Sequence, residues 1–297
     1  MNPEQNSNGI KYIIVVNTCN RPTELVAKCL EASLNQRILP KKIFLIDQNQ
    51  EPIKLPAPLS RNPLVTINKI NKKAVSAARN TIEVPENIDW IFFCDDDGYP
   101  CKDYSAIFKK ILTENPSLDI LAGSIVREDN KDYYTLRHKK GGSLKKFRNT
   151  KNLMGSNFVV KASVFNELGR FDENFGAGSY WGSSEETDFC WKAYFVGRNM
   201  EYFPELIVYH VPPFNESINK GFGKAFSYGV GKGALVSKWL FKKKKIKVTF
   251  ELFEMMIVPF IQSLRGLITF KFGLITSNFA ALTGRIYGMI KYLFVSH

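Results

Sequence analysis

Short apolar runs alternate with segments of helical periodicity through the first part of the chain. The runs are rich in β-branched residues and cover 11–17, 41–47, 64–67 and 89–94. Continuous runs of this length are typical of strands that are buried on both faces of a parallel sheet. Helical spacing lies between them. A helix that Thr23 could cap has Leu25, Cys29, Leu30 and Leu34 on its apolar stripe, and 75–82 is a short helix candidate. The alternation predicts an α/β fold with a mostly parallel sheet flanked by helices.

The pattern continues less regularly beyond residue 100. Strands are predicted at 157–160 and 201–209, and a helix at 183–197. Residues 129–152 are polar, basic and glycine-containing, which predicts an insertion or a mobile loop. The chain is therefore divided into a disordered N-terminus at 1–10, an α/β domain at 11–215 and a helical region at 216–297.

Three of the predicted strands end in polar residues. Thr18 follows the first strand, Asp47 ends the second, and three consecutive aspartates, 95–97, follow the run at 89–94. In open α/β sheets, ligands bind beyond the carboxyl ends of the strands. We therefore expect these ends to open onto one crevice.

The three aspartates repel one another unless something neutralises them. A hard divalent cation does so, and it commonly bridges carboxylates to substrate phosphates. Spacing of i and i+2 places Asp95 and Asp97 on one side of an extended turn. His210 ends the last predicted strand and is a further candidate ligand, more suited to Mn²⁺ than to Mg²⁺. The alternatives are a solvated turn and a structural histidine.

The segment 183–188, Ser-Ser-Glu-Glu-Thr-Asp, begins the predicted helix. Ser183 and Glu186 fit a capping box, and early acids suit the helix dipole, so no chemistry is required. The glycine-rich, aromatic lead-in at 176–182 is typical of a loop that contacts substrate. A carboxylate at this helix start is therefore also a candidate general base.

The positive charge is concentrated in the C-terminal region. Residues 220–297 carry thirteen Lys and Arg against two acids, whereas the preceding 219 residues carry 28 basic and 26 acidic residues. A dense lysine run at 242–247 precedes apolar residues at helical spacing, namely Phe250, Phe253, Ile257, Phe260, Ile261 and Leu264. Charges interrupt every stretch long enough to span a bilayer, so an interfacial amphipathic anchor on an anionic membrane is favoured. A homo-oligomer interface is the rival explanation.

Composition narrows the remaining classes of function. The five cysteines are odd in number and have no C-x-x-C spacing, which favours a reducing compartment over a disulfide or zinc framework. A nearly neutral body and an apolar basic tail argue against nucleic-acid binding. The glycines at 229, 231 and 233 follow no strand, so they indicate a helix-packing face rather than a nucleotide loop.

Six motifs, in this order and spacing, resemble the family-2 glycosyltransferases. They are IIVVNTCNRP at 13–22, LIDQNQ at 45–50, SAARN at 76–80, FFCDDDGYP at 92–100, MGSNFVVKASVFNELGRFDENFG at 154–176 and SEETDFCWKAYFVGRNMEYFPELIVYH at 184–210. The resemblance implies the Rossmann-like GT-A fold, with the C-terminal amphipathic helices as an extension. It also implies inverting transfer from a nucleotide-sugar donor, assisted by Mn²⁺ or Mg²⁺.

The resemblance also assigns roles to individual residues. The metal ligands would be Asp97, His210 and Asp95. Donor contacts would come from Thr18, Asn20, Arg21, Asp47, Arg79, Asp95 and Asp96, with Asp47 at the nucleotide base; for Arg79, a structural role beside an acidic neighbour is equally open. Acceptor contacts would come from Gly155, Ser156, Asn157, Trp181 and Asp188.

The catalytic base departs from the family pattern. Glu186 stands where the family usually has the catalytic Asp, and it is favoured here, with Glu185 as second choice. The second-strand segment also has Asp-Gln-Asn-Gln where Asp-Asn-Gly-Ser types are common, so the nucleotide base is left open.

The implied function is a hexosyl- or deoxyhexosyltransferase that uses a glycan or lipid-linked acceptor. Capsule, exopolysaccharide or O-antigen synthesis at the cytoplasmic side of the inner membrane fits the reducing compartment and the basic tail. A non-catalytic nucleotide-sugar or glycan-binding protein on the same fold is the alternative, because Glu186 replaces the usual Asp.

Overall fold

The computed structural model describes residues 9–212 and 218–295. The chain forms two compact units. The first comprises Met1–Lys73, Ala77–Arg170 and Phe189–Pro212, and the second comprises Ala74–Ser76, Phe171–Asp188 and Pro213–His297. The second unit thus takes two short segments from the part of the chain that precedes the predicted boundary at 215. Most of the predicted disordered N-terminus, residues 1–8, lies outside the described residues.

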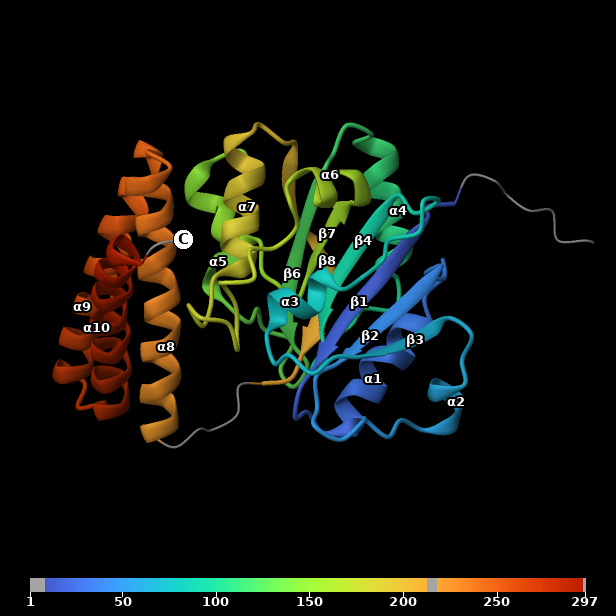
Figure 1. Cartoon of the computed structure of the whole chain (residues 1–297), viewed down its shortest axis with the longest axis horizontal. Helices are drawn as coiled ribbons and strands as arrows, with labels where there is room; N and C mark the ends of the chain where they lie inside the picture. The colour runs from blue at the N-terminus through green and yellow to red at the C-terminus, as the bar shows by residue number, and fades with distance from the viewer. Residues whose placement is uncertain (1–8, 213–217, 296–297) are drawn as a thin grey trace, which may run out of the picture. The chain divides into compact units, whose positions relative to one another are not determined.

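The first unit is built on one eight-stranded sheet, in the order β3-β2-β1-β4-β7-β6-β8-β5 (Figure 1). Its strands are β1 (Tyr12–Thr18), β2 (Lys42–Asp47), β3 (Val65–Lys69), β4 (Trp90–Asp95), β5 (Gly98–Pro100), β6 (Ile120–Arg127), β7 (Phe158–Lys161) and β8 (Met200–His210). The four strands β3, β2, β1 and β4 pair in parallel, as do β6 and β8. β7 pairs antiparallel with β4 and β6, and β5 pairs antiparallel with β8. The predicted mostly parallel α/β fold is confirmed, and each predicted strand occurs within two residues of its expected bounds.

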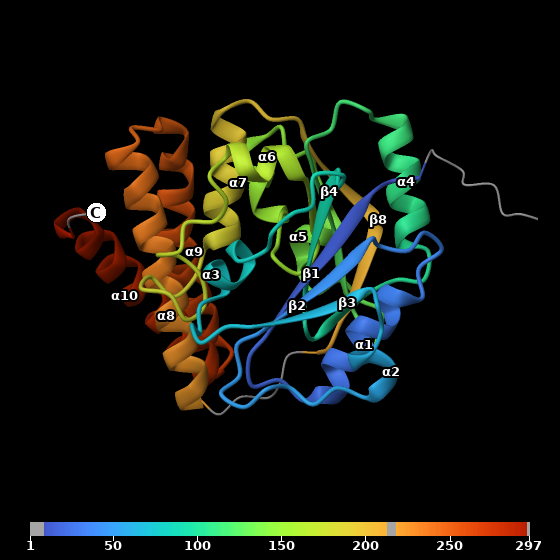
Figure 2. The same cartoon turned by 45° about the vertical axis from the view of Figure 1, so that its right-hand side comes forward.

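Helices cover both faces of this sheet. They are α1 (Thr23–Leu34), α2 (Ala57–Ser60), α4 (Tyr104–Glu114), α5 (Leu136–Lys140) and α6 (Ala162–Glu167), while α3 (Val75–Asn80) and α7 (Glu185–Phe195) have residues in both units. Alternation along each strand supplies the two faces. Ile14 and Val16 of β1 belong to the core with α1 and α4. On the opposite face, Phe93 of β4 packs against Phe165 of α6, at 5.4 Å between ring centroids. Figure 2 shows α1 and α4 on one side of the strands and α6 on the other.

Residues 129–152, predicted as an insertion or a mobile loop, include two short helices. They contain α5 and the 3₁₀ helix η1 (Phe147–Asn152). His138 is fully buried, accepts a hydrogen bond from the Ile125 amide at Nδ1 (3.1 Å), and lies 5.7 Å from the Tyr202 ring. Burial lowers the pKa of His138 to about 4, so the imidazole is neutral. Few apolar residues mark this segment in the sequence; Leu144 and Phe147 are buried, whereas Leu136 is exposed.

The C-terminal region is helical. It contains α8 (Ile218–Ser237), a π-helical turn η2 (Lys238–Lys242), a 3₁₀ turn η3 (Ile246–Val248), α9 (Thr249–Ile268) and α10 (Phe272–Phe294). Both views show α8 and α10 side by side. A Cβ atom on Gly233 would lie 2.0 Å from the Arg285 carbonyl oxygen, and one on Gly288 would lie 2.0 Å from the Val230 carbonyl oxygen. The predicted helix-packing face of small residues is therefore confirmed.

A stripe of large apolar side chains remains exposed on α9. It consists of the six residues predicted from their helical spacing: Phe250, Phe253, Ile257, Phe260, Ile261 and Leu264, which are 46–64% exposed. Among the residues that the structure describes, no helix combines the length and apolarity needed to cross a bilayer.

Candidate functional site

Strand pairing brings the triple aspartate and the histidine together. Asp95 is the last residue of β4, and β5 begins three residues later at Gly98. Gly98 lies opposite His210 in the antiparallel β5–β8 ladder. The Val211 amide donates to the Asp97 carbonyl oxygen (3.1 Å), which continues this pairing. The register of two short strands therefore places Asp97 beside His210.

Asp95, Asp97 and His210 form a candidate metal group. One ligand atom from each lies within 4.8 Å of the others. His210 Nδ1 donates to the Val211 carbonyl oxygen (2.9 Å), which leaves Nε2 directed at Asp97 Oδ1, 3.0 Å away. A backbone partner on one ring nitrogen fixes the tautomer and orientation of a ligating imidazole. The sequence-predicted metal residues are thus assembled in one place.

The donor atoms suit a divalent cation. Carboxylate oxygens favour Mg²⁺ and Mn²⁺, and an imidazole nitrogen makes the set a better fit to Mn²⁺. Burial alone would raise the pKa of Asp97, but the hydrogen bond and charge of His210, with the charge of Arg21, lower it. The Asp97 carboxylate is therefore ionised. Burial alone would lower the pKa of His210, but the same hydrogen bond and the charge of Asp97 raise it to about 9, so a metal would have to displace the proton from Nε2. The residues present fit the metal that the sequence predicts.

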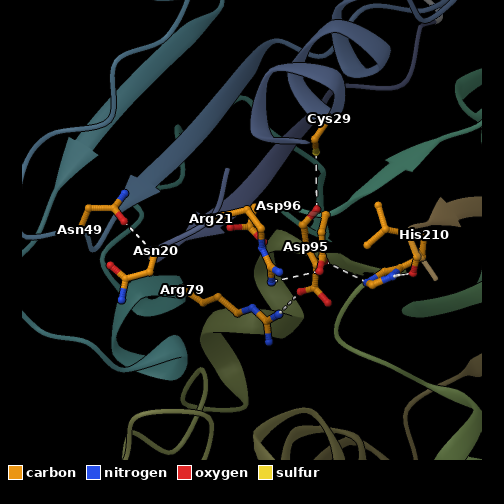
Figure 3. A network of polar contacts seen from close by, with 10 residues as sticks. Asn20, Arg21, Cys29, Asn49, Arg79, Asp95, Asp96 and His210 are labelled. Carbon is orange, nitrogen blue, oxygen red and sulfur yellow. Dashed lines mark hydrogen bonds and ion pairs between the residues drawn. The ribbon is translucent and has the colours of Figure 1, made fainter. Parts of the chain in front are cut away.

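Two arginines neutralise the rest of the carboxylate cluster. Arg21, in the turn after β1, lies 3.0 Å from Asp96 Oδ1 through Nε and 3.0 Å from Asp97 Oδ2 through Nη2. Burial raises the pKa of Asp96 to about 6, although Arg21 opposes this shift. Arg79, almost fully buried, lies 3.2 Å from Asp95 Oδ1. Figure 3 shows both guanidinium groups directed at the aspartates.

The structural role considered for Arg79 is therefore seen directly. Its Nη2 also donates to the Gly155 carbonyl oxygen (3.4 Å), and a Cβ atom on Gly155 would lie 3.0 Å from it. Gly155, predicted for the acceptor, thus packs against the guanidinium that neutralises Asp95. A side chain at this position would displace that guanidinium.

The turns after β1 and β2 are tied to each other. Asp47 is fully buried, and its carboxylate accepts from the Asn49 amide (2.9 Å) and the Ile53 amide (2.9 Å). Asn49 Oδ1 in turn accepts from the Asn20 amide (2.5 Å), and Asn20 has a left-handed φ of 54°. Thr18, at the end of β1, is buried. Asp47 therefore shapes the loop beside the strand ends.

Asn157 connects three elements of the first unit. Its Nδ2 donates to the carbonyl oxygens of Ser124 (2.7 Å) and Leu206 (2.8 Å), and its Oδ1 accepts from the Tyr104 hydroxyl (2.8 Å). Asn157 is fully buried and Ser156 nearly so. These bonds occupy the side-chain amide of Asn157, which was predicted to contact the acceptor.

The remaining predicted residues belong to the second unit. Glu185 is the first residue of α7 and is 8% exposed, whereas Glu186 is half-buried. Gly176 lies directly against Glu185, since its Cβ atom would meet the Glu185 carboxyl carbon at 3.2 Å. Gly176 has φ +108°, a conformation that L side chains rarely adopt. Trp181 is buried, 5.3 Å from the ring of Tyr292.

Asp188 is fully buried and bound from the C-terminal region. Its Oδ1 lies 2.7 Å from Lys238 Nζ and accepts from Trp239 Nε1 (2.7 Å). The sequence analysis did not single out Lys238, Trp239 or Asp172, which pairs with the same lysine. The sequence signal for Lys238 and Trp239 was their position directly after the helix that carries Gly229, Gly231 and Gly233.

Comparison with known proteins identifies the family. The family model described as glycosyl transferase family 2 matches residues 13–169. The chain belongs to this family. No curated protein sequence matches it. Among solved structures, the mannosyltransferase PcManGT from Pyrobaculum calidifontis, in complex with GDP-Man and Mn²⁺, is similar with a TM-score of 0.59 and 16% sequence identity. The similarity covers 94% of this chain and 76% of that one, and it supports the predicted GT-A fold.

The match covers part of the site of this family-2 glycosyltransferase. Asp95, Asp96 and Asp97 lie inside the matched residues 13–169. His210 and the two glutamates of α7 lie beyond them. The place of His210 in the metal group therefore rests on the strand register and the distances given above.

Proposed function

We propose that this glycosyltransferase moves a sugar, with inversion, from a nucleotide-sugar donor to a hydroxyl of a glycan or lipid-linked acceptor. The observation that carries the proposal is the Asp95–Asp97–His210 group at the strand ends of a family-2 chain. A metal held there would supply positive charge for the diphosphate leaving group. The neighbour's title names GDP-Man and Mn²⁺, which supports a nucleotide-sugar and Mn²⁺ here.

The chain's own residues have separate tasks in this proposal. Arg21 and Arg79 hold the carboxylates of the cluster in place through their ion pairs with Asp96 and Asp95. Asp47 keeps the loop after β2 in shape for the donor nucleotide. Each acts by orienting groups that would otherwise repel one another or move apart.

The acceptor would be activated from the start of α7. The carboxylate of Glu186 takes the hydroxyl proton while the acceptor oxygen bonds to the anomeric carbon. The bond from that carbon to the nucleoside diphosphate breaks in the same step, and the diphosphate leaves with the electron pair. Glu185 is the second choice, because it is nearly buried behind Gly176.

The setting proposed is the cytoplasmic face of the inner membrane. The exposed apolar stripe on α9 and the lysines at 242–247 support attachment to an anionic lipid surface, because one supplies burial and the other charge attraction. A hexosyl or deoxyhexosyl donor and a role in capsule, exopolysaccharide or O-antigen synthesis are consistent with a lipid-linked acceptor at that surface.

Calorimetric titration with GDP-, UDP- and dTDP-sugars, with and without Mn²⁺, tests the donor site. We expect one nucleotide class to bind only with Mn²⁺, and Asp97→Asn to abolish this binding because it removes a charged ligand. Glu114→Gln is the matched control, since Glu114 is exposed on α4, pairs with Lys110 and does not belong to the metal group. Metal-independent binding, or none in a folded wild-type protein, would contradict the proposal.

A non-catalytic binding protein is the second candidate, favoured by Glu186 at the usual Asp position. The same samples separate the two functions. Release of nucleoside diphosphate from the bound donor supports an enzyme, whereas metal-dependent binding without release over hours supports a binding protein.

A further inference from the structure

Lys238 lies between two aspartates of the second unit. Its ammonium nitrogen is 2.9 Å from Asp172 Oδ2 and 2.7 Å from Asp188 Oδ1. It also lies 4.9 Å from the centre of the Phe175 ring. Lys238 is 8% exposed, and Asp188 is fully buried. This is a buried ionic cluster, and its lysine is contributed by the turn that follows α8.

Trp239 binds the same carboxylate. Its Nε1 donates to Asp188 Oδ1 (2.7 Å), and the residue is buried. Two consecutive residues of the C-terminal region, Lys238 and Trp239, therefore contact the same carboxylate oxygen of Asp188 in α7. The Asp188 amide donates to the Ser184 carbonyl oxygen (2.9 Å), so this aspartate lies in the first turn of the helix.

Asp172 and Asp188 lie at the two ends of the segment 172–188. Asp172 Oδ1 accepts from the Asn174 amide (3.0 Å) and the Asn174 side chain (3.0 Å), which organises the start of the glycine-rich loop. Burial alone would raise the pKa of Asp172, but the charge of Lys238 and its hydrogen bonds lower it. One ammonium group thus joins both ends of the 172–188 segment.

The 172–188 segment carries the residues proposed for the acceptor side. Trp181 lies within it, and Glu185 and Glu186 lie three and two residues before its end. Four of its backbone positions have positive φ: Gly176, Gly178, Gly182 and Ser184. A segment with such turns has many alternative conformations, and closing its ends removes many of them.

An ionic cluster is an unexpected way to pack one helix against another. Burying an ammonium with two carboxylates carries a desolvation cost that apolar packing avoids, so such clusters contribute to a defined geometry more than to stability. The neighbouring α8–α10 contact is made by glycines and needs no charge. The cluster therefore holds a particular arrangement of the segment.

We propose that Lys238 is a positioning residue for glycosyl transfer, because it closes the 172–188 segment and thereby sets the direction of Glu185 and Glu186. The inference rests on the proposed function. It makes the C-terminal region part of the acceptor side, required for turnover as well as for any attachment to a surface.

Three variants test this role. Lys238→Met removes the charge and keeps most of the side-chain length, and Trp239→Phe removes only the N–H donor. Lys271→Met is the matched control, because Lys271 is exposed in the C-terminal region and lies outside the lysine run at 242–247. The measurements are hydrogen–deuterium exchange of all peptides, Mn²⁺ binding, and steady-state release of nucleoside diphosphate.

We expect faster exchange in the 172–188 segment for Lys238→Met, and a smaller increase for Trp239→Phe, which keeps the charge. The Lys238→Met kcat falls by about 10²-fold, the size typical of a displaced catalytic group. Mn²⁺ binding and the donor KM stay at the wild-type values, since the metal group belongs to the first unit. Lys271→Met behaves as wild type throughout.

Unchanged exchange in the segment, unchanged kcat, or a loss of Mn²⁺ binding in the folded Trp239→Phe protein would overturn the assignment. A wild-type protein that turns over none of the donors refutes the proposed function instead. In that case the exchange measurement still decides whether Lys238 closes the segment.

Discussion

Glu185 and Glu186 are adjacent in the sequence, but their side chains have different surroundings. Glu185 is nearly buried behind Gly176, whereas Glu186 is half-buried. A general base needs access to the proton it removes. Glu186 therefore stays the proposed base, as in the family pattern.

Glu186→Gln should lower kcat by about 10²–10⁴-fold, the usual contribution of a general base. The amide keeps the size of the side chain but cannot take the proton, and the donor KM should not change. Steady-state release of nucleoside diphosphate measures both quantities, with Glu185→Gln as the matched neighbour. A larger kcat loss in Glu185→Gln would show that Glu185, and not Glu186, is the general base.

Residue types and spacing identified the metal group, but they did not give the partners of the other acids. Asp95, Asp97 and His210 were found because strand ends in an α/β sheet meet at one edge. The bonds from Asp47 to the loop after β2 and from Asp188 to Lys238 depend on packing that spacing does not encode. Asp188 and its lysine are 50 residues apart in the chain.

At the scale of elements, the local pattern of apolar residues was sufficient to predict an element that consists mostly of buried apolar residues. β1 and β4 are such strands, with nearly every residue buried. The two short helices of the segment 129–152 were not predicted, because its sequence is mostly polar and basic. Its order comes from distant partners, for example Phe147 packed 5.2 Å from the Trp191 ring.

The α8–α10 contact gives a prediction for single glycines. Gly288→Ala places a methyl carbon 2.0 Å from the Val230 carbonyl oxygen. This is too close for a contact, so the helices must separate. Overpacking of this kind costs about 1–3 kcal/mol. Hydrogen exchange should therefore become faster in α8 and α10 together.

Gly273→Ala in the same helix is the control. Its Cβ atom would meet nothing within 4 Å, so the change should slow exchange in α10 through a gain in helix propensity of about 1 kcal/mol. Equal effects of the two alanines would show that the close contact does not hold these helices together.

At the scale of the whole molecule, the apolar stripe on α9 is the feature that needs a partner. Vesicles containing anionic lipid should retain the protein at low salt and release it as salt rises, because the lysines at 242–247 contribute about 1 kcal/mol each. Replacing Phe253, Ile257 and Ile261 by serine should abolish retention, since all three are at least half exposed. Flotation with neutral and anionic vesicles measures this.

Leu136→Ser controls for the loss of an exposed apolar residue, because Leu136 is 78% exposed in the first unit. Retention of the triple variant on anionic vesicles at the wild-type level would contradict the membrane proposal. A change from dimer to monomer in light scattering would show that a second copy of the chain covers the stripe.

The register of β5 against β8 has a consequence for how the metal arrives. Asp97 and His210 are set side by side by a hydrogen-bonded ladder, so their relative position is fixed before any ion binds. Little conformational entropy is then lost on coordination, and no loop has to order first. Capture of the ion should be fast and preorganised, and heating should weaken it only when the sheet itself opens.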